Sequence, residues 1–285
     1  MSIIYEKDGN VLVCDDNVSY LQTVPNNYID LFFFSPPYDQ ARDYIDKPTF
    51  DLHALGLEMF RTLKDGGVVV CVIQDQTKNF QKSLTSFRTL IDWVDTCGFK
   101  YWETVIYKRK GRPGGWWKTR LRVDHEYIFI LFKGSRPKYF QKEHLQVLTS
   151  KIYHIPHGGA RLNNGGFQKK TKKDSQGMYI DPGTIFTYVN SSMEGIIDKD
   201  IKLKHPATFP DKMAEDFIQM FCPEGGLVCD PFGGSGTTGV GALHTGRKFI
   251  LIDISEEYCK EIALKRIEVH SGISKPTNAN LEDLL

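Results

Sequence analysis

The residues with the most definite chemistry lie near the carboxyl end of the chain, where a glycine-rich turn joins an apolar run to a predicted helix. Residues 234–239 read GSGTTG, which satisfies the spacing GxGxxG, and Asp253 ends the next apolar run. Glycines let a ligand approach the backbone, a helix amino terminus presents free N–H groups, and a strand-end carboxylate can accept hydrogen bonds from two ribose hydroxyls. GxGxxG alone is a weak signal, but the strand context and Asp253 favour nucleotide binding.

Asp230 separates the classes of ligand that such a turn could bind. It stands with Pro231, Phe232 and Gly233 where a dinucleotide would bring its pyrophosphate, and two anions would repel each other there. S-adenosylmethionine instead carries an ammonium group and a sulfonium ion, which a carboxylate would attract. A nicotinamide dehydrogenase would explain only the glycines and Asp253, and the P-loop motif GxxxxGK is absent. The other role open to Asp230 is that of a helix cap.

A second group of residues, Ser35-Pro36-Pro37-Tyr38, directly follows the apolar run 30–34 and so lies at the end of a predicted strand. The two prolines fix the backbone and remove two N–H donors, which leaves carbonyl oxygens able to accept. An exocyclic amine could donate one hydrogen to the Pro36 carbonyl and the other to the Ser35 hydroxyl, while its ring stacks on Tyr38. The motif predicts a site for methyl transfer to a planar amine, and a proline-stiffened turn is the other interpretation.

Together these motifs resemble the amino-methyltransferases of DNA. That family combines a tetrapeptide of Asp, Asn or Ser, two prolines and an aromatic residue with a cofactor loop DPFxGSGTT, and this chain has SPPY and DPFGGSGTT. The segment HPATFP at 205–210 is similar to a family segment that helps to bind the methyl donor, and CDDN at 14–17 to its acidic turn near the cofactor adenine. The resemblance implies that the residues binding S-adenosylmethionine are Asp16, Ser35, His205, Thr208, Phe209, Pro210, Asp230, Pro231, Phe232, Gly233, Gly234, Ser235, Gly236, Thr237, Thr238 and Asp253.

The order of the motifs, with SPPY first, a recognition insert in the middle and the cofactor loop last, resembles the beta group of that family. It implies a circularly permuted, Rossmann-like α/β fold with a mixed, mostly parallel sheet and helices on both faces. The expected division is a catalytic half at 1–133, a target-recognition insert at 134–204, the cofactor half of the same domain at 205–270 and a flexible tail at 271–285.

Serine at position 35 resembles the enzymes that methylate the N4 amine of cytosine, whereas aspartate there is usual for N6 of adenine. The expected product is therefore N4-methylcytosine in duplex DNA, with N6-methyladenine as the alternative. The target base must leave the stack, because the methyl donor cannot reach an amine inside a duplex. Methylation of cytosine carbon is disfavoured, since it needs a cysteine nucleophile and no Pro-Cys dipeptide occurs. The intact donor and acceptor motifs disfavour a DNA-binding protein without catalysis.

The elements that must position these motifs alternate along the chain. Apolar runs predict strands and amphipathic stretches predict helices, the first of which should end in a turn at 64–67. The predicted strands are 10–14, 30–34, 67–73, 99–107, 125–133, 227–230 and 248–253, and the predicted helices are 51–63, 80–97, 211–221, 237–244 and 256–269.

Basic residues crowd into the middle of the chain. Residues 100–142 hold 12 Lys and Arg against 3 Asp and Glu, although the whole chain has a net charge of only +1. Cations hold DNA phosphates without regard to sequence, and a glycine-rich loop can order around a duplex as it binds. The alternatives are a solvated surface and, for the paired tryptophans, a place in the core. The residues expected to contact DNA are Lys108, Arg109, Lys110, Arg112, Trp116, Trp117, Lys118, Lys169, Lys170, Lys172 and Lys173.

The composition, 285 residues with 41% hydrophobic and 25% charged, is that of a globular protein and excludes disordered and fibrous classes. No apolar stretch approaches the roughly 18 residues of a membrane-spanning helix, and the amino terminus lacks the features of a signal peptide. Six cysteines without a CxxC pair suggest neither disulfides nor zinc, so we expect a cytoplasmic protein without a metal. The expected partner is double-stranded DNA, without a membrane, and a cognate restriction endonuclease and a homodimer are left open.

Overall fold

The computed structural model describes residues 1–37, 51–110, 121, 123–148, 160–161, 167–168, 179–189, 191 and 194–272. The chain divides into two compact units, a larger one of residues 1–141 with 184–285 and a smaller one of residues 142–183. Among the described residues, no helix has the length and apolar character needed to span a membrane.

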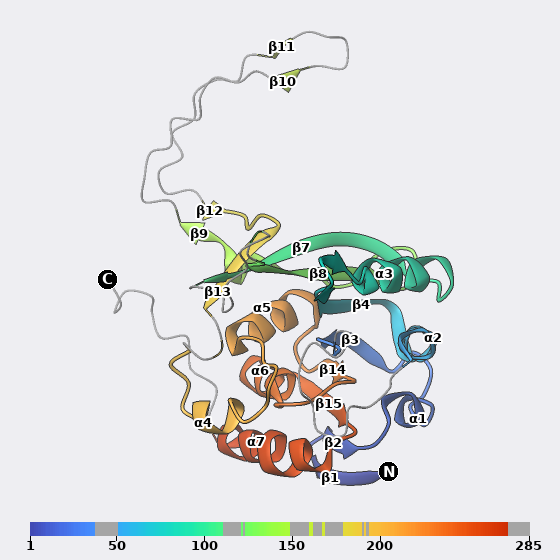
Figure 1. Ribbon diagram of the computed structural model, residues 1–285, viewed down its shortest axis with the longest axis vertical. Helices are drawn as coiled ribbons and strands as arrows, with labels where there is room; N and C mark the ends of the chain where they lie inside the picture. Colours follow the sequence, from blue (N-terminus) through green and yellow to red (C-terminus); the bar gives the residue numbers. More distant parts are fainter. Residues whose placement is uncertain are drawn as a thin grey trace. The chain divides into compact units, whose positions relative to one another are not determined.

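The larger unit is built on a nine-stranded sheet with the order β1-β2-β15-β14-β3-β4-β8-β7-β13 (Figure 1). Its strands are β1 (Ser2–Lys7), β2 (Asn10–Cys14), β3 (Ile29–Phe34), β4 (Leu63–Ile73), β7 (Lys100–Lys110), β8 (His125–Phe132), β13 (Ile185–Val189), β14 (Leu227–Asp230) and β15 (Lys248–Asp253). All of them except β1 and β8 run in one direction. The central strands come from both ends of the chain, which confirms the predicted mostly parallel, Rossmann-like fold.

The connections diverge between β14 and β3. From β14 the chain passes through a helix to β15 on one side, whereas from β3 it passes through a helix to β4 on the other side. In open α/β sheets, ligands bind outside the carboxyl ends of the strands at such a switch point. The ends of these two neighbouring strands carry Asp230 and Ser35, so the two predicted motifs flank the switch point.

Helices cover both faces of the sheet in this unit. Helices α1, α2 and α3 pack in succession on one face, and α5, α6 and α7 on the other (Figure 1). The helices are α1 (Asn17–Leu21), α2 (Leu52–Thr62), α3 (Thr85–Asp95), α4 (Lys199–Lys202), α5 (Asp211–Phe221), α6 (Thr237–Thr245) and α7 (Leu264–Ser271), the last of which continues a π-helix, η3 (Tyr258–Ala263).

The aromatic run at the end of β3 shows why both faces must be covered. Phe32 and Phe34 are buried in a cluster with Trp93 of α3, while Phe33 points to the other face and stacks on Phe217 of α5, with ring centroids 6.1 Å apart. Strands buried on both faces carry continuous apolar runs because every side chain meets a helix. The run therefore anchors the strand whose end carries Ser35.

Two predicted elements near the amino-terminal half were wrong in detail. Residues 77–82 form a short hairpin, β5 (Thr77–Lys78) with β6 (Gln81–Lys82), and Leu84 has a φ of 61°, so the helix predicted at 80–97 begins only at Thr85. The predicted turn at 64–67 belongs to β4, because α2 passes directly into the strand at Leu63. The extra residues are accommodated by a register shift against β3, where Gly66 has a φ of 81°.

The middle of the chain divides differently from the expected boundaries. Residues 134–141 and 184–204, which the sequence analysis gave to the insert, belong to the larger unit, and β13 extends its sheet. The smaller unit contains the paired strands β9 (Val147–Leu148) and β12 (Tyr179–Ile180), and β10 (Ala160–Arg161) pairs with β11 (Phe167–Gln168). The carboxylate of Asp181 accepts hydrogen bonds there from Lys142 at 2.5 Å and from Gln146 at 2.7 Å.

Candidate functional site

The predicted cofactor residues gather at one edge of the sheet because they follow neighbouring parallel strands. Asp16 follows β2, Asp253 ends β15, Asp230 ends β14 and Ser35 follows β3. The carboxyl ends of parallel strands meet at the same edge, so residues more than 200 positions apart in sequence become neighbours. Three of these residues are carboxylates, Asp16, Asp230 and Asp253, and their charge favours a positively charged ligand.

The glycine turn after β14 is held by Asp253, which accepts hydrogen bonds from the Gly234 N–H at 2.7 Å and the Ser255 N–H at 2.9 Å. Burial raises the pKa of Asp253 to about 6, although these two bonds lower it. Two of the glycines are required by geometry. Gly234 has a φ of 46° and a Cβ there would lie 3.0 Å from the His205 ring, while Gly236 has a φ of 72° and faces the backbone of η3 at 3.1 Å.

Asp230 lies beneath this turn with only 2% of its surface exposed. Its carboxylate accepts hydrogen bonds from the Phe232 N–H at 2.9 Å and from the Thr238 hydroxyl at 2.6 Å. Burial raises its pKa to about 7, against the lowering effect of these bonds. The alternative of a helix cap is not observed, because the amino-terminal cap of α6 is Gly236 and no side chain bonds its N–H groups. A buried carboxylate that resists ionisation is a suitable counterion for a ligand cation.

The Ser35-Pro36-Pro37 segment is connected to the glycine turn through Thr238. The Thr238 hydroxyl that binds Asp230 also lies 3.3 Å from the carbonyl oxygen of Phe33, two residues before Ser35. Pro36 is buried, whereas Ser35 and Pro37 are half-buried at the end of β3. The motif is therefore fixed to the same framework as Asp230. Tyr38, predicted to stack on the target base, lies outside the described residues.

The side chains of the segment 205–210 pack against residues around the site. The His205 ring meets Tyr258 with centroids 4.4 Å apart, and burial lowers its pKa to about 4, so the ring is neutral at pH 7. Phe209 packs edge-to-face on Phe33 at 5.3 Å. The Thr208 carbonyl accepts a hydrogen bond from Ser191. The Pro210 carbonyl accepts hydrogen bonds from N–H groups in the first turn of α5.

Several residues of the site have structural partners that sequence reasoning did not supply. Asp16 caps α1 by accepting a hydrogen bond from the Ser19 N–H at 2.9 Å. The next residue, Asn17, donates a hydrogen bond to the Pro231 carbonyl at 3.2 Å and so ties the acidic turn to the cofactor turn. The only sequence signal for Asn17 is its place beside Asp16.

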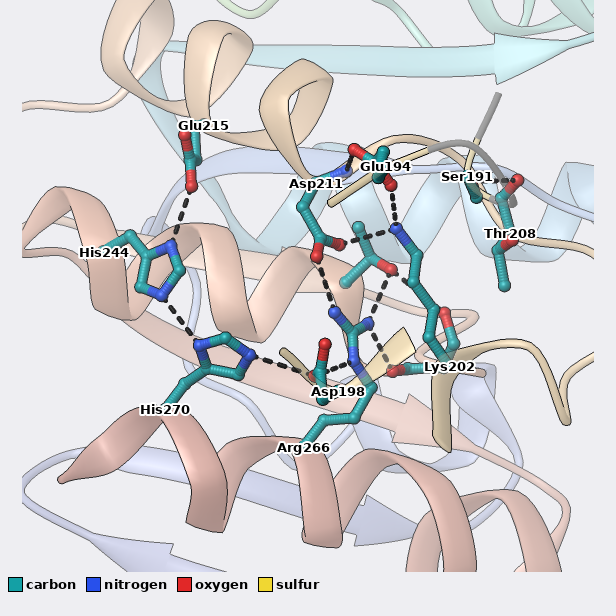
Figure 2. A network of polar contacts seen from close by, with 12 residues as sticks. Ser191, Glu194, Asp198, Lys202, Thr208, Asp211, Glu215, His244, Arg266 and His270 are labelled. Atoms are coloured by element: carbon teal, nitrogen blue, oxygen red, sulfur yellow. Dashed lines mark hydrogen bonds and ion pairs between the residues drawn. The ribbon is translucent and has the colours of Figure 1, made fainter. Parts of the chain in front are cut away.

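The hydroxyls of Ser235 and Thr237 point into the protein, where they lie 3.0 Å apart. Arg266 of α7 donates hydrogen bonds to the Ser235 carbonyl at 2.9 Å and to the Thr237 hydroxyl at 3.0 Å. Figure 2 shows this fully buried arginine between Asp198 and Asp211. Arg266 has no signal in the sequence for this position, because basic residues on an amphipathic helix usually face solvent.

The basic segment predicted to be a DNA-binding loop begins instead as a strand. Lys108, Arg109 and Lys110 end β7, paired with β8 and β13, so only part of that prediction concerns a loop. Lys108 and Lys110 are exposed on one face, whereas Arg109 lies on the other face, 3.5 Å from Glu126. Outside the described residues lie Arg112, Trp116, Trp117, Lys118, Lys169, Lys170, Lys172 and Lys173.

Away from this edge, a group of possible metal ligands joins α2 to α3 in the described part of the chain. His53 and Asp92 lie 2.9 Å apart and the Cys97 sulfur lies about 4 Å from both. Burial raises the pKa of Cys97 to about 11, so its thiol is protonated at pH 7. These contacts are hydrogen bonds that connect the two helices.

Comparison with known proteins matches residues 29–265 to the model of a DNA methylase family, N6_N4_Mtase. The chain is 35% identical to the orphan methyltransferase M.BamHII of Bacillus amyloliquefaciens, covering 84% of this chain and 89% of the relative. It is 43% identical to the DNA adenine methyltransferase YhdJ of Escherichia coli strain K12, covering 95% and 86%.

Two solved structures share the fold. The PvuII DNA methyltransferase, described as cytosine-N4-specific, superposes with a TM-score of 0.65 at 22% identity, covering 98% of this chain and 91% of that one. The M1.HpyAVI-SAM complex gives a TM-score of 0.55 at 17% identity, covering 90% and 98%.

Proposed function

The chain belongs to this family of DNA methylases, and we propose that it transfers a methyl group from S-adenosylmethionine to the N4 amine of cytosine in duplex DNA. The observation that carries the proposal is the placement of Ser35-Pro36-Pro37 at the end of β3, beside Asp230 at the end of β14. A methyl donor and an amine acceptor could meet there across the switch point of the sheet.

The residues at this edge fit S-adenosylmethionine. Asp230 offers a buried carboxylate with a raised pKa, and the ionised form of that carboxylate would be stabilised by a ligand cation. Asp253 could accept hydrogen bonds from the ribose in addition to those from Gly234 and Ser255. When bound, S-adenosylmethionine supplies an electrophilic methyl group. The SAM complex of M1.HpyAVI supports the same cofactor here.

The protein groups around the amine would do two things. The Ser35 hydroxyl and the Pro36 carbonyl accept hydrogen bonds from the two amine hydrogens, which turns the nitrogen lone pair toward the methyl donor. Because the base must be extruded to reach them, Tyr38 would hold the flipped ring by stacking. As the new bond to nitrogen forms, the methyl–sulfur bond would break with its electron pair left on sulfur, so that the donor departs as a neutral thioether. The extra proton on the methylated amine would then leave to solvent or to a weak base.

The target base is the open choice. Ser35 and the fold of the cytosine-N4-specific PvuII enzyme favour cytosine, whereas 43% identity to a DNA adenine methyltransferase favours N6 of adenine as the second candidate. Plasmid DNA should be incubated with the protein and labelled S-adenosylmethionine, then digested to nucleosides for mass analysis. Labelled N4-methylcytosine is expected. Labelled N6-methyladenine would show that adenine and not cytosine is the target, while the proposed mechanism of methyl transfer would stand. If no nucleoside is labelled, both target bases are rejected.

Further proposals concern how the protein recognises DNA, where it acts and which partners it has. We propose that the smaller unit, 142–183, carries sequence recognition, and that the basic end of β7 contacts the DNA backbone. The six cysteines are free thiols, as suits the reducing cytoplasm in which we place the enzyme. A homodimer and a cognate restriction endonuclease remain the additional partners to test by sizing and by pull-down.

A further inference from the structure

A buried network of charges centred on Arg266 lies against the glycine turn (Figure 2). The Arg266 guanidinium donates four hydrogen bonds, two to carboxylates and two to the turn. Asp198 accepts at 2.6 Å and Asp211 at 2.7 Å, while the Ser235 carbonyl and the Thr237 hydroxyl accept from the same nitrogen, Nη1. The planar fork of arginine is what allows four bonds in fixed directions.

The two carboxylates are themselves fixed from other elements. Lys202, also fully buried, donates hydrogen bonds to Asp211 at 2.8 Å and to Glu194 at 2.7 Å. Although burial raises the pKa of Asp198, its hydrogen bonds with His270 and Arg266 hold that pKa well below its ordinary value. A buried guanidinium needs such paired partners, because an unpaired one would be strongly destabilising. Arg266 is therefore a rigid donor, held from α4, α5 and α7.

The two bonds to the turn determine the orientation of its backbone. The Ser235 carbonyl accepts from Arg266 at 2.9 Å, and the Gly236 N–H of the same peptide group donates to the Gly233 carbonyl at 2.7 Å, so both ends of this peptide group are held. The second bond holds the side chain of Thr237, the first residue of α6, whose N–H is among those at the helix start that have no partner within the helix. Both bonds come from a side chain that is fully buried.

We propose that Arg266 is a positioning residue of the methyl-donor site, which sets the affinity for S-adenosylmethionine by holding Ser235 and Thr237 without touching the cofactor. The inference rests on the proposed function, because it assumes that this turn binds the methyl donor. A residue that served only the stability of the core would lower the melting temperature and leave cofactor affinity unchanged in the folded protein.

The test compares Arg266→Lys with a control from the same network, His244→Gln. Lysine keeps the buried charge but cannot direct two bonds to the turn and two to the carboxylates. His244 bonds Glu215 and His270 on the far arm of the network, so its loss should lower stability without reaching the turn. Calorimetry with S-adenosylmethionine, thermal unfolding, DNA affinity and the separate values of kcat and KM should be measured for both.

For Arg266→Lys we expect the Kd and KM for S-adenosylmethionine to rise about tenfold, as the loss of one to two hydrogen bonds requires. DNA affinity and kcat at saturating cofactor should stay within about twofold, and the control should bind cofactor like the wild type. Unchanged cofactor affinity in folded Arg266→Lys would overturn the proposal. If the wild type itself fails to bind S-adenosylmethionine, the proposed function fails first.

A second variant decides the matter if Arg266→Lys does not fold. Thr237→Val keeps the shape and leaves the charge network intact, but removes the hydroxyl that accepts from Arg266. We expect weaker cofactor binding, and in the double variant, where it folds, less than additive losses, because the two residues act through one contact. Wild-type affinity in Thr237→Val, or fully additive losses, would show that Arg266 does not act through Thr237.

Discussion

Replacing Asp230 by Asn should make the free protein more stable and bind its cofactor more weakly. Asn keeps the size of the side chain, its oxygen can still accept from the Phe232 N–H, and the Thr238 hydroxyl can turn to accept from the new amide. The variant therefore removes the charge and little else. Opposite effects on stability and binding are expected where a buried charge is retained for its ligand.

The magnitude follows from the pKa of Asp230, which burial raises from 3.8 to about 7. At 1.36 kcal/mol per pH unit, ionising this buried group at pH 8 costs about 4 kcal/mol of folding stability. Since the folded pKa lies above the unfolded one, the stability is fully present below about pH 4 and is lost as the pH rises through about 7. In Asp230→Asn this loss should disappear, so the melting temperature should exceed that of the wild type at pH 8.

Cofactor binding should depend on the same titration of Asp230, but affinity should rise with pH where stability falls. A cation next to Asp230 lowers its pKa, so binding at pH 6 should release about one proton and affinity should increase from pH 6 to 8. Calorimetry in two buffers of different ionisation enthalpy measures the released protons directly. At pH 8, where the carboxylate is ionised, Asp230→Asn should bind S-adenosylmethionine about 10- to 150-fold more weakly, for a lost charged partner of about 1.5–3 kcal/mol.

The variant also serves as its own control for the ligand. The amino group of S-adenosylmethionine titrates near pH 8, as α-amino groups do at about 7.7–8.0. That titration remains in Asp230→Asn, so only the difference between the two proteins reports on Asp230. Equal proton release in both proteins at pH 6, or equal affinity at pH 8, would refute the role of this carboxylate.

Three further outcomes can be measured with the same preparations. Ser35→Ala should lose turnover to a far greater extent than it loses affinity for cofactor or DNA, and retained turnover in a radiolabel assay would exclude the hydroxyl from the chemistry. Replacing Arg109, Lys110 and Arg112 by Ala should weaken all DNA sequences alike and flatten the salt slope by about 0.9 per lost phosphate contact. Arg109 should contribute least because it faces Glu126. A hydrogen bond to a glutamate of α5 raises the pKa of His244. The stability that this hydrogen bond adds is therefore fully present below about pH 6.5, the ordinary pKa of histidine, and is lost as the pH rises through the pKa of His244 in the folded protein. His244→Gln should remove that dependence from melting curves taken between pH 5 and 8.

The central strands and main helices could be predicted because their apolar patterns are local. The runs at 10–14, 30–34 and 227–230 match β2, β3 and β14 to within a residue, since each is buried on both faces. The hairpin at 77–82 was missed, because the turn depends on positive φ angles at Asn79 and Phe80, which sequence rarely signals for residues other than glycine. β13 was hidden in a segment of weak pattern, being only a partly buried edge strand.

The site divides in the same way between what is local and what is not. Glycines and strand-end carboxylates have local signatures, so the turn and Asp230 could be found from the sequence. The partners of Arg266 lie 29 to 68 residues away along the chain, and no spacing rule connects a helical arginine to them. Buried charges are only recognisable once folding has brought their counterions together.

The permuted order of the motifs explains why the site depends on such long-range contacts. SPPY and the cofactor turn are about 200 residues apart, and backbone pairing between β14 and β3, at Val228 with Leu31, fixes one against the other. Asn17, Thr238 and Arg266 then bind the turn from three different elements, respectively through Pro231, Asp230 and Ser235. Because the donor and acceptor motifs are far apart in the sequence, no short stretch of chain joins them. The pairing of the strands and these side-chain contacts therefore hold the two halves of the site together.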